Sequence, residues 1–143
     1  RIPVLVASNT SVGVFCLTEL AVAARKILGD DYDVEILEVH HRHKKDAPSG
    51  TAISIADALR RTGLELAVGR TGQRGDDEIG IASARGGEVV GTHTVYFLGR
   101  HDQIEICHRA ASREGLAEGA VRLGESLKQL APGWYAVADL LRR

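Results

Sequence analysis

The sequence contains little of several residue types, and these shortages narrow the classes of protein to which it could belong. Its 143 residues include no methionine, two cysteines, three prolines and one tryptophan. No apolar run approaches the roughly 20 residues that a membrane-spanning helix needs, which excludes membrane insertion. Cys16 and Cys107 stand among apolar residues and no secretory leader is visible. We therefore interpret both cysteines as buried hydrophobic side chains of a cytoplasmic protein rather than as a disulfide.

The sequence also lacks an excess of either charge. Lysine and arginine together number 18 against 19 for aspartate and glutamate, which gives a formal net charge of −1. A nucleic-acid-binding protein is not expected, because such proteins present a basic surface to phosphates. Hydrophobic residues make up 44% of the chain and charged residues 26%, which is typical of a soluble globular protein of one domain.

The first residues suggest that the chain is the later part of a longer protein. They read RIPVLVAS, an apolar run without alternation that is typical of a buried parallel strand. A sheet covered on both faces would need partner strands from an earlier segment. We therefore expect residues 1–12 to end an earlier domain, residues 13–130 to form the main domain, and residues 131–143 to be a tail that returns toward the earlier domain.

Hydrophobic periodicity predicts an α+β fold with helices on one face of an open, mixed but mainly antiparallel sheet of about four strands. The predicted helices cover residues 14–28, 51–63 and 114–130. The predicted strands cover residues 33–41, 79–85, 88–98 and 103–110, and glycine-containing connections join the last three in an antiparallel meander. The polar segment 70–78 is expected to be a mobile surface loop.

The strand at 88–98 places apolar residues on both of its faces. One face carries Val90, Thr92, Thr94, Tyr96 and Leu98, and the other carries Val89, Val95 and Phe97. The predicted helices can cover only one face of the sheet. An uncovered apolar sheet face usually marks a subunit interface, so we expect a homo-oligomer built sheet against sheet.

Residues 40–52 concentrate positive charge in an otherwise balanced chain. They read HHRHKKDAPSGTA, with histidines at a strand end, lysines in a loop and a turn that starts a helix. Backbone N–H groups at Ser49, Gly50 and Thr51 would attract an anion at the positive end of the helix dipole. A small dicarboxylate would suit this arrangement, with its second carboxylate near Lys44 or His41. A histidine at such a site is a candidate proton donor near neutral pH.

Other interpretations of the same segment remain open on the local pattern alone. It could be a solvated basic cluster, and Ser49 to Ala52 could be a helix cap without a ligand. A zinc site is weakly supported, because His41 and His43 share a face while His40 points away and only Asp46 is nearby. We predict no metal. Nucleic acid is weaker still, because no aromatic side chains accompany the basic run.

Residues 38–52 resemble the signature of the dihydrodipicolinate reductase family, E-x-H-H-x-x-K-x-D-x-P-S-G-T-A. The segments SNTSVGV, GGEVVGTHTV and ICHRAASR are also similar to segments of that family. The resemblance implies an oxidoreductase of lysine and diaminopimelate biosynthesis. Such an enzyme transfers hydride from NADH or NADPH to a cyclic dicarboxylate derived from 4-hydroxy-tetrahydrodipicolinate. It also implies a homotetramer.

The resemblance assigns a role to each matching residue. His40 would donate the proton, and Lys44 would bind substrate and assist that step. The ring dicarboxylate would be held by His41, Lys44, Ser49, Gly50 and Thr51. Arg113 is similar to a family arginine near the site, although a structural ion pair explains it equally well.

The family's dinucleotide-binding domain, with its glycine-rich turn, is absent from the sequence. Only the end of the cofactor contact would remain, at Ala7, Ser8, Asn9 and Thr10. We therefore expect a substrate-binding part that is inactive alone. The alternative hypothesis is an isolated small-anion-binding or oligomerisation module without chemistry of its own.

Overall fold

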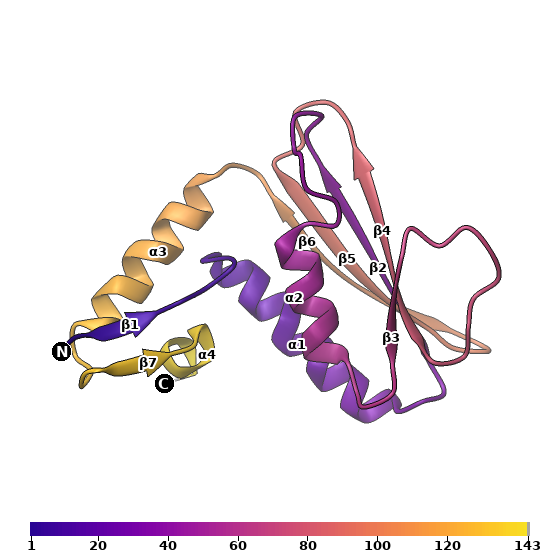
Figure 1. The fold of residues 1–143 in the computed structure, drawn as a ribbon, viewed down its shortest axis with the longest axis horizontal. Helices are drawn as coiled ribbons and strands as arrows, with labels where there is room; N and C mark the ends of the chain where they lie inside the picture. The colour runs from indigo at the N-terminus through magenta and orange to yellow at the C-terminus, as the bar shows by residue number, and fades with distance from the viewer. Residues whose placement is uncertain (143) are drawn as a thin grey trace. The chain divides into compact units, whose positions relative to one another are not determined.

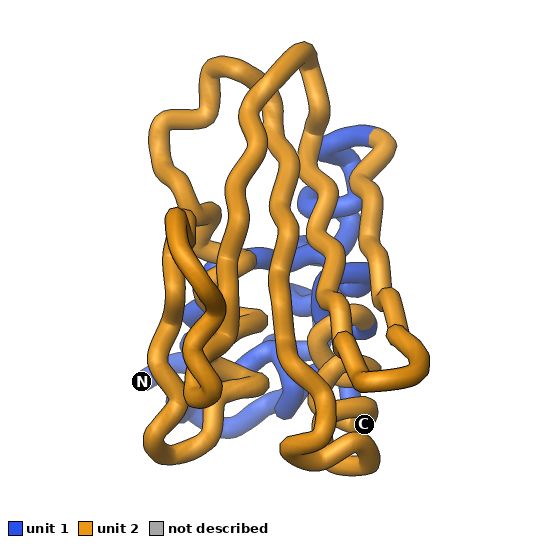
Figure 2. The backbone as a smooth tube through the Cα atoms, turned by 90° about the vertical axis from the view of Figure 1, so that its right-hand side faces the viewer, with its two compact units in different colours: residues 1–16, 112–143 blue, residues 17–111 orange. Residues whose placement is uncertain are grey.

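A computed structural model describes residues 1–142, which form two compact units. Unit 1 contains residues 1–16 and the C-terminal segment from residue 112, and unit 2 contains residues 17–111 (Figure 2). The last residue of the predicted tail, residue 143, lies outside the described residues. The predicted domain boundaries at residues 12 and 130 remain predictions.

The helices and strands follow one another as an α+β chain (Figure 1). In order they are β1 (Pro3–Leu5), α1 (Val12–Leu28), β2 (Asp33–His40), α2 (Gly50–Leu59), β3 (Glu65–Val68), β4 (Glu78–Arg85), β5 (Gly91–Leu98), β6 (Gln103–Ala110), α3 (Glu114–Leu127), β7 (Gly133–Tyr135) and α4 (Val137–Leu141). The α+β class is confirmed. The short elements β3, β7 and α4 were not predicted from the sequence.

The five-stranded sheet of unit 2 has the order β3-β4-β2-β5-β6. β2 pairs parallel with β4 and antiparallel with β5, and β3 pairs parallel with β4. The predicted meander is therefore wrong at its first step, because β2 lies between β4 and β5. The pair of glycines at 86–87 is short enough for a hairpin, but a local turn signal does not reveal that an earlier strand is inserted there. Only β5 and β6 form the expected antiparallel hairpin.

The core of unit 2 lies between one face of this sheet and the helices. Apolar residues recur along α1 and α2 at helical spacing, so that each helix presents one apolar stripe to the sheet. Leu17 and Ala21 on α1 and Ile55 on α2 pack against the aliphatic residues of the sheet. α1 ends where Gly29 adopts a φ of +65°, a conformation that favours glycine.

No helix of unit 2, all of whose residues are described, covers the opposite face of the sheet (Figure 1). Tyr96 belongs to this open face, whereas Val95 is fully buried in the core on the other side. β5 begins only at Gly91, so Val89 and Val90 lie in the connection before it. The sequence-based division of β5 into two apolar faces was thus wrong at its first residues. The helix-covered face also carries His93.

The segment between β3 and β4 is a loop, as predicted, but two of its arginines are ion-paired. Arg70 contacts Glu35 and Glu78, and Arg74 contacts the same two carboxylates and Asp33. Glu35 lies on the open face of β2 opposite Gly80, where an added Cβ would collide with its carboxylate. These contacts limit the freedom of the two arginine side chains.

Unit 1 pairs the two ends of the chain. β1 runs parallel to β7, which confirms a parallel strand at the start of the chain. Its expected burial on both faces is not observed in the described residues, because β1 is only half-buried and Trp134 of β7 is 79% exposed. α3 packs closely on the segment before α1, where a Cβ at Gly119 would collide with the Thr10 carbonyl. Within residues 1–142 no helix has the length and apolar character needed to cross a membrane.

Candidate active site

The helix-covered face of the sheet changes from aliphatic to polar toward the carboxyl end of β2. Alternate β2 residues point to this face, first Val34 and Ile36, then Glu38 and His40. Their neighbours across the sheet follow the same change, from Ile79, Ile81, Val95 and Phe97 to Ser83, Arg85 and His93. A strand that begins in the core therefore ends by placing titratable side chains in a largely buried setting.

Glu38 is the centre of a buried network that consists of Glu38, His40, Ser49, Arg85 and His93. Its side chain is fully buried and accepts hydrogen bonds from Arg85, His40 and the Ser49 backbone. Arg85 donates to both carboxylate oxygens at 2.8 and 2.6 Å. His40 Nδ1 lies 2.5 Å from Oε2, and the Ser49 backbone N–H donates to Oε1 at 3.2 Å. The carboxylate thus joins the strand end, β4 and the start of α2.

The electrostatic state of the network follows from burial and from Arg85. Burial by itself raises the pKa of Glu38, but hydrogen bonds from Arg85, Ser83 and His40 outweigh it and lower the pKa to about 2. Burial lowers the pKa of His40 and exceeds the opposing influence of the Glu38 carboxylate. Burial, followed by the proximity of His40, lowers the pKa of His93 to about 4. At neutral pH Glu38 is therefore an anion, while both imidazoles are mostly neutral.

Ser49 connects this network to the N-terminus of α2. Its side chain caps the helix by accepting from the Ala52 N–H at 3.1 Å, and its Oγ lies 3.0 Å from His93 Nε2. Thr51 is buried, whereas Gly50 is exposed. Gly50 does not adopt a positive φ, and a Cβ added there would have no neighbour within 4 Å. Neither backbone conformation nor protein packing therefore requires glycine at the first residue of α2.

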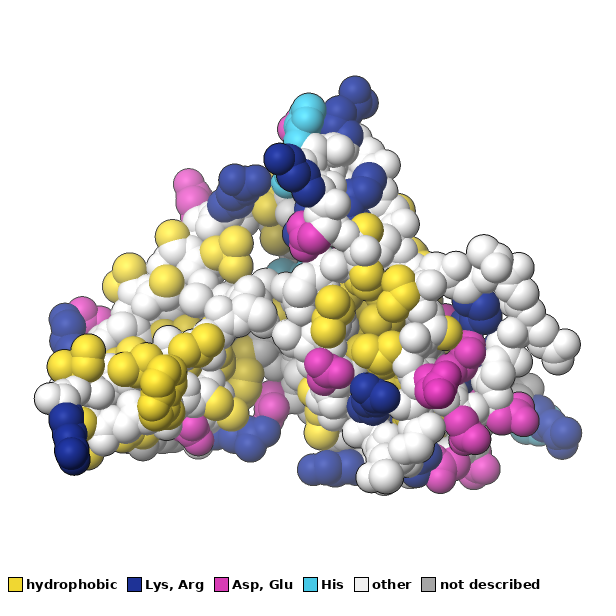
Figure 3. Space-filling view, in the orientation of Figure 1, with side chains coloured by type: hydrophobic (Ala, Val, Ile, Leu, Met, Phe, Trp, Pro, Cys, Tyr) yellow, Lys and Arg dark blue, Asp and Glu magenta, His cyan; other side chains and the backbone are white. Residues whose placement is uncertain are grey.

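The predicted charge cluster is partly neutralised by the protein itself. Lys44 Nζ donates to both oxygens of Asp46 at 2.8 Å, and Arg85 is paired with Glu38 and donates to the Asp46 carbonyl. His41 and His43 lie with ring centroids 6.2 Å apart. Lysine, arginine and histidine side chains gather at the end of unit 2, where β2 stops (Figure 3). The positive end of the α2 dipole adds to this local potential.

Three of these side chains also have the composition of a metal-binding set. The ligand atoms of Glu38, His40 and His93 all lie within 4.8 Å of one another. However, both oxygens of Glu38 already accept hydrogen bonds from Arg85, whose positive charge opposes a second cation. The donor set therefore favours a hydrogen-bonded network over a metal site, and the prediction of no metal is retained.

The residues predicted to contact a cofactor lie in unit 1, between β1 and α1. Ala7 and Ser8 are exposed. Asn9 Oδ1 accepts from the Ser11 N–H at 2.8 Å, and Thr10 Oγ1 donates to the Leu116 carbonyl at 2.7 Å. These contacts order the loop that leads into α1. Arg113 also belongs to unit 1, as the residue that precedes α3.

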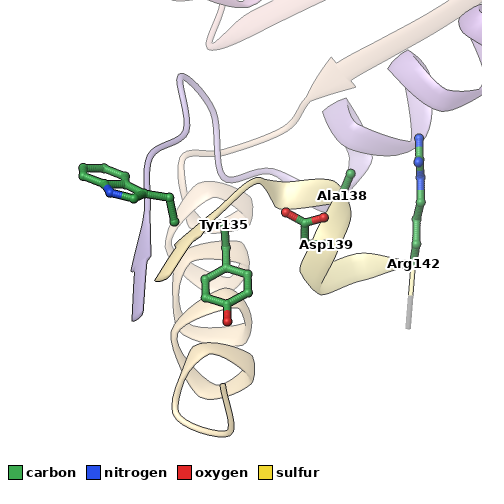
Figure 4. A pocket seen from close by; sticks show the side chains of 5 residues that line it. Tyr135, Ala138, Asp139 and Arg142 are labelled. Carbon is green, nitrogen blue, oxygen red and sulfur yellow. The ribbon is translucent and has the colours of Figure 1, made fainter. Parts of the chain in front are cut away.

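Unit 1 contains a surface hollow of about 540 Å³ beside α4, but none of the predicted site residues line it. Figure 4 shows Tyr135, Asp139 and Arg142 around this hollow. The Tyr135 hydroxyl donates to the Ala131 carbonyl, and Asp139 accepts from the Ala136 N–H. Both groups therefore stabilise the local backbone.

Glu38, Arg85 and His93 are site residues to which sequence reasoning assigned no role. Alternation along β2 places Glu38 on the same face as His40, so this part of the network could have been found. Arg85 and His93 could not, because their contacts depend on β2 being inserted between β4 and β5. The sequence gives no direct signal of that insertion.

Comparisons with known proteins agree with the fold and with the motif. The family model described as dihydrodipicolinate reductase, C-terminus, matches residues 13–141. The protein named 4-hydroxy-tetrahydrodipicolinate reductase of Aquifex aeolicus is 51% identical over 145 residues, covering 97% of this chain and 54% of that protein. The protein of the same name from Pseudomonas fluorescens is 49% identical over 148 residues, covering 98% and 55%. The chain thus spans about half the length of these relatives.

A solved structure has the same fold. It is the dipicolinate-bound dihydrodipicolinate reductase from Paenisporosarcina sp. TG-14, with a TM-score of 0.71 and 24% sequence identity. The likeness covers 96% of this chain and 54% of that one.

Proposed function

The chain belongs to the dihydrodipicolinate reductase family, whose C-terminal part it matches, and on this premise we propose that it is the substrate-binding and proton-donating part of a 4-hydroxy-tetrahydrodipicolinate reductase. The whole enzyme would reduce a cyclic dicarboxylate with hydride from NADH or NADPH, in lysine and diaminopimelate biosynthesis. Hydride addition to one ring atom requires a proton at its neighbour. An acid placed beside an anion site meets that requirement.

The observation that carries the proposal is the unfilled space at the start of α2, next to the buried network. An anion there can accept from backbone N–H groups at the helix N-terminus, including those of Gly50 and Thr51. Glycine at position 50 leaves room for the ligand to approach the backbone, since protein atoms do not occupy that space. The second carboxylate would then meet Lys44 or His41 in the preceding loop.

His40 is the proposed proton donor. It is mostly neutral in the free protein because burial lowers its pKa. A dianionic ligand would favour the charged imidazolium, so binding would raise the pKa of His40 and load it with the proton that it later donates. Lys44 would contribute charge to both binding and proton transfer, after exchanging part of its contact with Asp46 for the ligand.

The cofactor is proposed to enter with a dinucleotide-binding domain outside this chain. Ala7 to Thr10 would contact its nicotinamide end. The pyrophosphate of a dinucleotide is usually held by a glycine-rich βα turn, which this sequence does not contain. The chain alone is therefore expected to bind a dicarboxylate but to have no reductase activity. The open face of the sheet would form a homotetramer, because the apolar side chains on it, such as Tyr96, need a second layer.

Calorimetric titration of the purified chain with pyridine-2,6-dicarboxylate tests the proposal. The informative variant is Gly50→Ala, because a methyl group at this position would occupy the ligand's space while leaving the protein's own packing unchanged. We expect its affinity for the dicarboxylate to fall at least about 10-fold. Benzoate, with one carboxylate, should bind more weakly than the dicarboxylate to the unaltered chain.

Gly115→Ala is a matched control for that variant. Gly115 also lies in the first turn of a helix, α3, and an added Cβ there has no neighbour within 4 Å. Both substitutions should slightly favour their helices, but only the change at Gly50 should affect binding. Absence of dicarboxylate binding to the unaltered chain would support a module without this chemistry. Micromolar binding of NADH or NADPH would contradict the assigned cofactor site.

A further inference from the structure

The contact between Glu38 and His40 determines which nitrogen of the His40 ring carries a hydrogen, as well as where the ring lies. An ionised carboxylate has lone pairs and no proton, so it can only accept hydrogen bonds. Glu38 is held in that ionised form by Arg85, which donates to both of its oxygens. His40 Nδ1, 2.5 Å from Oε2, must therefore carry a hydrogen. Consequently Nε2 is the nitrogen that gains and loses the exchangeable proton.

Other neighbours fix the plane and position of the same ring. Gly91 lies against it, and a Cβ at that position would approach Nε2 to 2.9 Å. His93 stands edge-on, with ring centroids 5.1 Å apart and an interplanar angle of 72°. His93 in turn contacts Ser49 Oγ. The His40 ring is thus confined on several sides, while its side chain remains 11% exposed.

Ser49 couples the ring to the anion site at the start of α2. Its backbone N–H donates to Glu38, and its hydroxyl caps α2. A movement of Glu38 would therefore shift both the imidazole and the first residue before the helix. Glu38 consequently sets the distance between His40, the proposed proton donor, and the proposed carboxylate site at the start of α2.

From this geometry we infer that Glu38, clamped by Arg85, is a positioning residue that fixes the Nδ1–H tautomer and the orientation of His40, so that Nε2 is presented as the proton-transferring atom. The inference rests on the proposed function for its catalytic meaning, but the tautomer itself is a property of the free protein. If the pair were only structural, it would hold β2 to β4 without controlling which nitrogen of His40 is protonated.

The charges that face His40 predict how its pKa responds when the charge of Glu38 is removed. Glu38 on β2 favours the imidazolium, whereas Arg85 on β4 and Lys44 in the loop after β2 oppose it. His93 on β5 is neutral near pH 7, because burial lowers its pKa to about 4. Removing the charge of Glu38 should therefore lower the pKa of His40.

The test is a pH titration of the chain labelled with ¹⁵N-histidine, in which long-range ¹H–¹⁵N spectra report the tautomer and pKa of His40. In the unaltered chain the neutral ring should be protonated at Nδ1. In Glu38→Gln the single amide oxygen should be retained by Arg85 and the Ser49 N–H, so that the amide NH₂ faces Nδ1. The neutral ring should then switch to the Nε2–H tautomer, and its pKa should fall by about one unit.

Two further variants keep the test decisive if Glu38→Gln folds poorly. Arg85→Lys, which keeps a positive charge beside Glu38, should retain the Nδ1–H tautomer of His40. Glu35→Gln is the matched control, since Glu35 is on the same strand and is also paired with arginines, but on the opposite face. It should leave both tautomer and pKa unchanged. An unaltered tautomer in Glu38→Gln, or a switch to the Nε2–H tautomer in Arg85→Lys, would overturn the inference.

Kinetics separate this inference from the proposed function. In a reductase that contains this chain and a dinucleotide-binding domain, Glu38→Gln should lower kcat at least about 10-fold while changing KM little. A purely structural role would alter KM and kcat together. Failure of the dicarboxylate to bind the unaltered chain would reject the proposed function but leave the tautomer measurement intact.

Discussion

The Glu38–Arg85 pair should make the stability of the fold depend strongly on pH in the acid range. The folded-state pKa of Glu38 is about 2, against an ordinary value of 4.5. A difference of about 2.5 units, at about 1.4 kcal/mol per unit, corresponds to about 3.5 kcal/mol of stability. Because the folded-state pKa is depressed, this contribution is fully present above about pH 4.5 and is lost as the pH falls toward 2.

Glu38→Gln removes this contribution at every pH. Near pH 7 the free energy of unfolding of the variant should be about 3.5 kcal/mol lower than that of the unaltered chain, since the partly buried Arg85 charge loses its partner. As the pH falls to 2 and below, the two proteins should approach the same stability, because Glu38 then takes up its proton in the folded chain as well as in the unfolded chain. Carboxylates common to both proteins contribute equally and cancel in the difference.

Urea denaturation followed by far-ultraviolet circular dichroism, at several pH values from 7 to 2.5, measures this difference. Glu125→Gln is the control, because Glu125 forms an exposed ion pair with Lys128 on α3. Its loss should change stability by little more than the experimental error. Parallel pH profiles for the unaltered chain and Glu38→Gln would refute the depressed pKa and, with it, the clamp by Arg85.

Three further predictions concern the proposed function. In the complete reductase, His40→Gln should lower kcat by about 10²- to 10⁴-fold. Near-normal kcat in this variant would show that His40 is not the proton donor. Lys44→Ala should raise KM as well as lower kcat. Tyr96→Glu should dissociate the oligomer in sedimentation experiments, and a monodisperse, folded monomer of the unaltered chain would contradict an assembly through the open sheet face. Binding of pyridine-2,6-dicarboxylate at pH 7 should take up a proton, because it raises the pKa of His40. The affinity should therefore weaken as the pH rises. Calorimetric binding heats that do not depend on the ionisation enthalpy of the buffer would contradict this coupling.

Much of the fold could be predicted from local patterns. The long helices α1, α2 and α3 have apolar residues at helical spacing, and β2 has alternating burial, so their existence was predictable with errors of a few residues at their ends. The pairing of β4 was not predictable. Its parallel partners β2 and β3 come from earlier in the chain, and parallel pairing leaves no short turn in the sequence to reveal it.

The candidate site, like the fold, was predictable only where its residues are neighbours along the chain. The residue types in 40–52 and their order predicted an anion site at a helix start beside a histidine, because strand end, loop and helix are consecutive in the chain. The sequence could also indicate that Glu38 and His40 share a face. It did not indicate that Lys44 would be paired with Asp46, since both lie in a loop without a regular period.

The sequence by itself therefore determined the family, the helix whose N-terminus is proposed to bind an anion, and the histidine beside it, because each depends on residues that are neighbours along the chain. Only the tertiary structure decided the electrostatic state of that histidine. Insertion of β2 between β4 and β5 brings Arg85 and His93 to either side of Glu38 and His40, across separations of about 50 residues. Burial then makes those contacts strong, since charges excluded from water interact in a medium that screens them weakly.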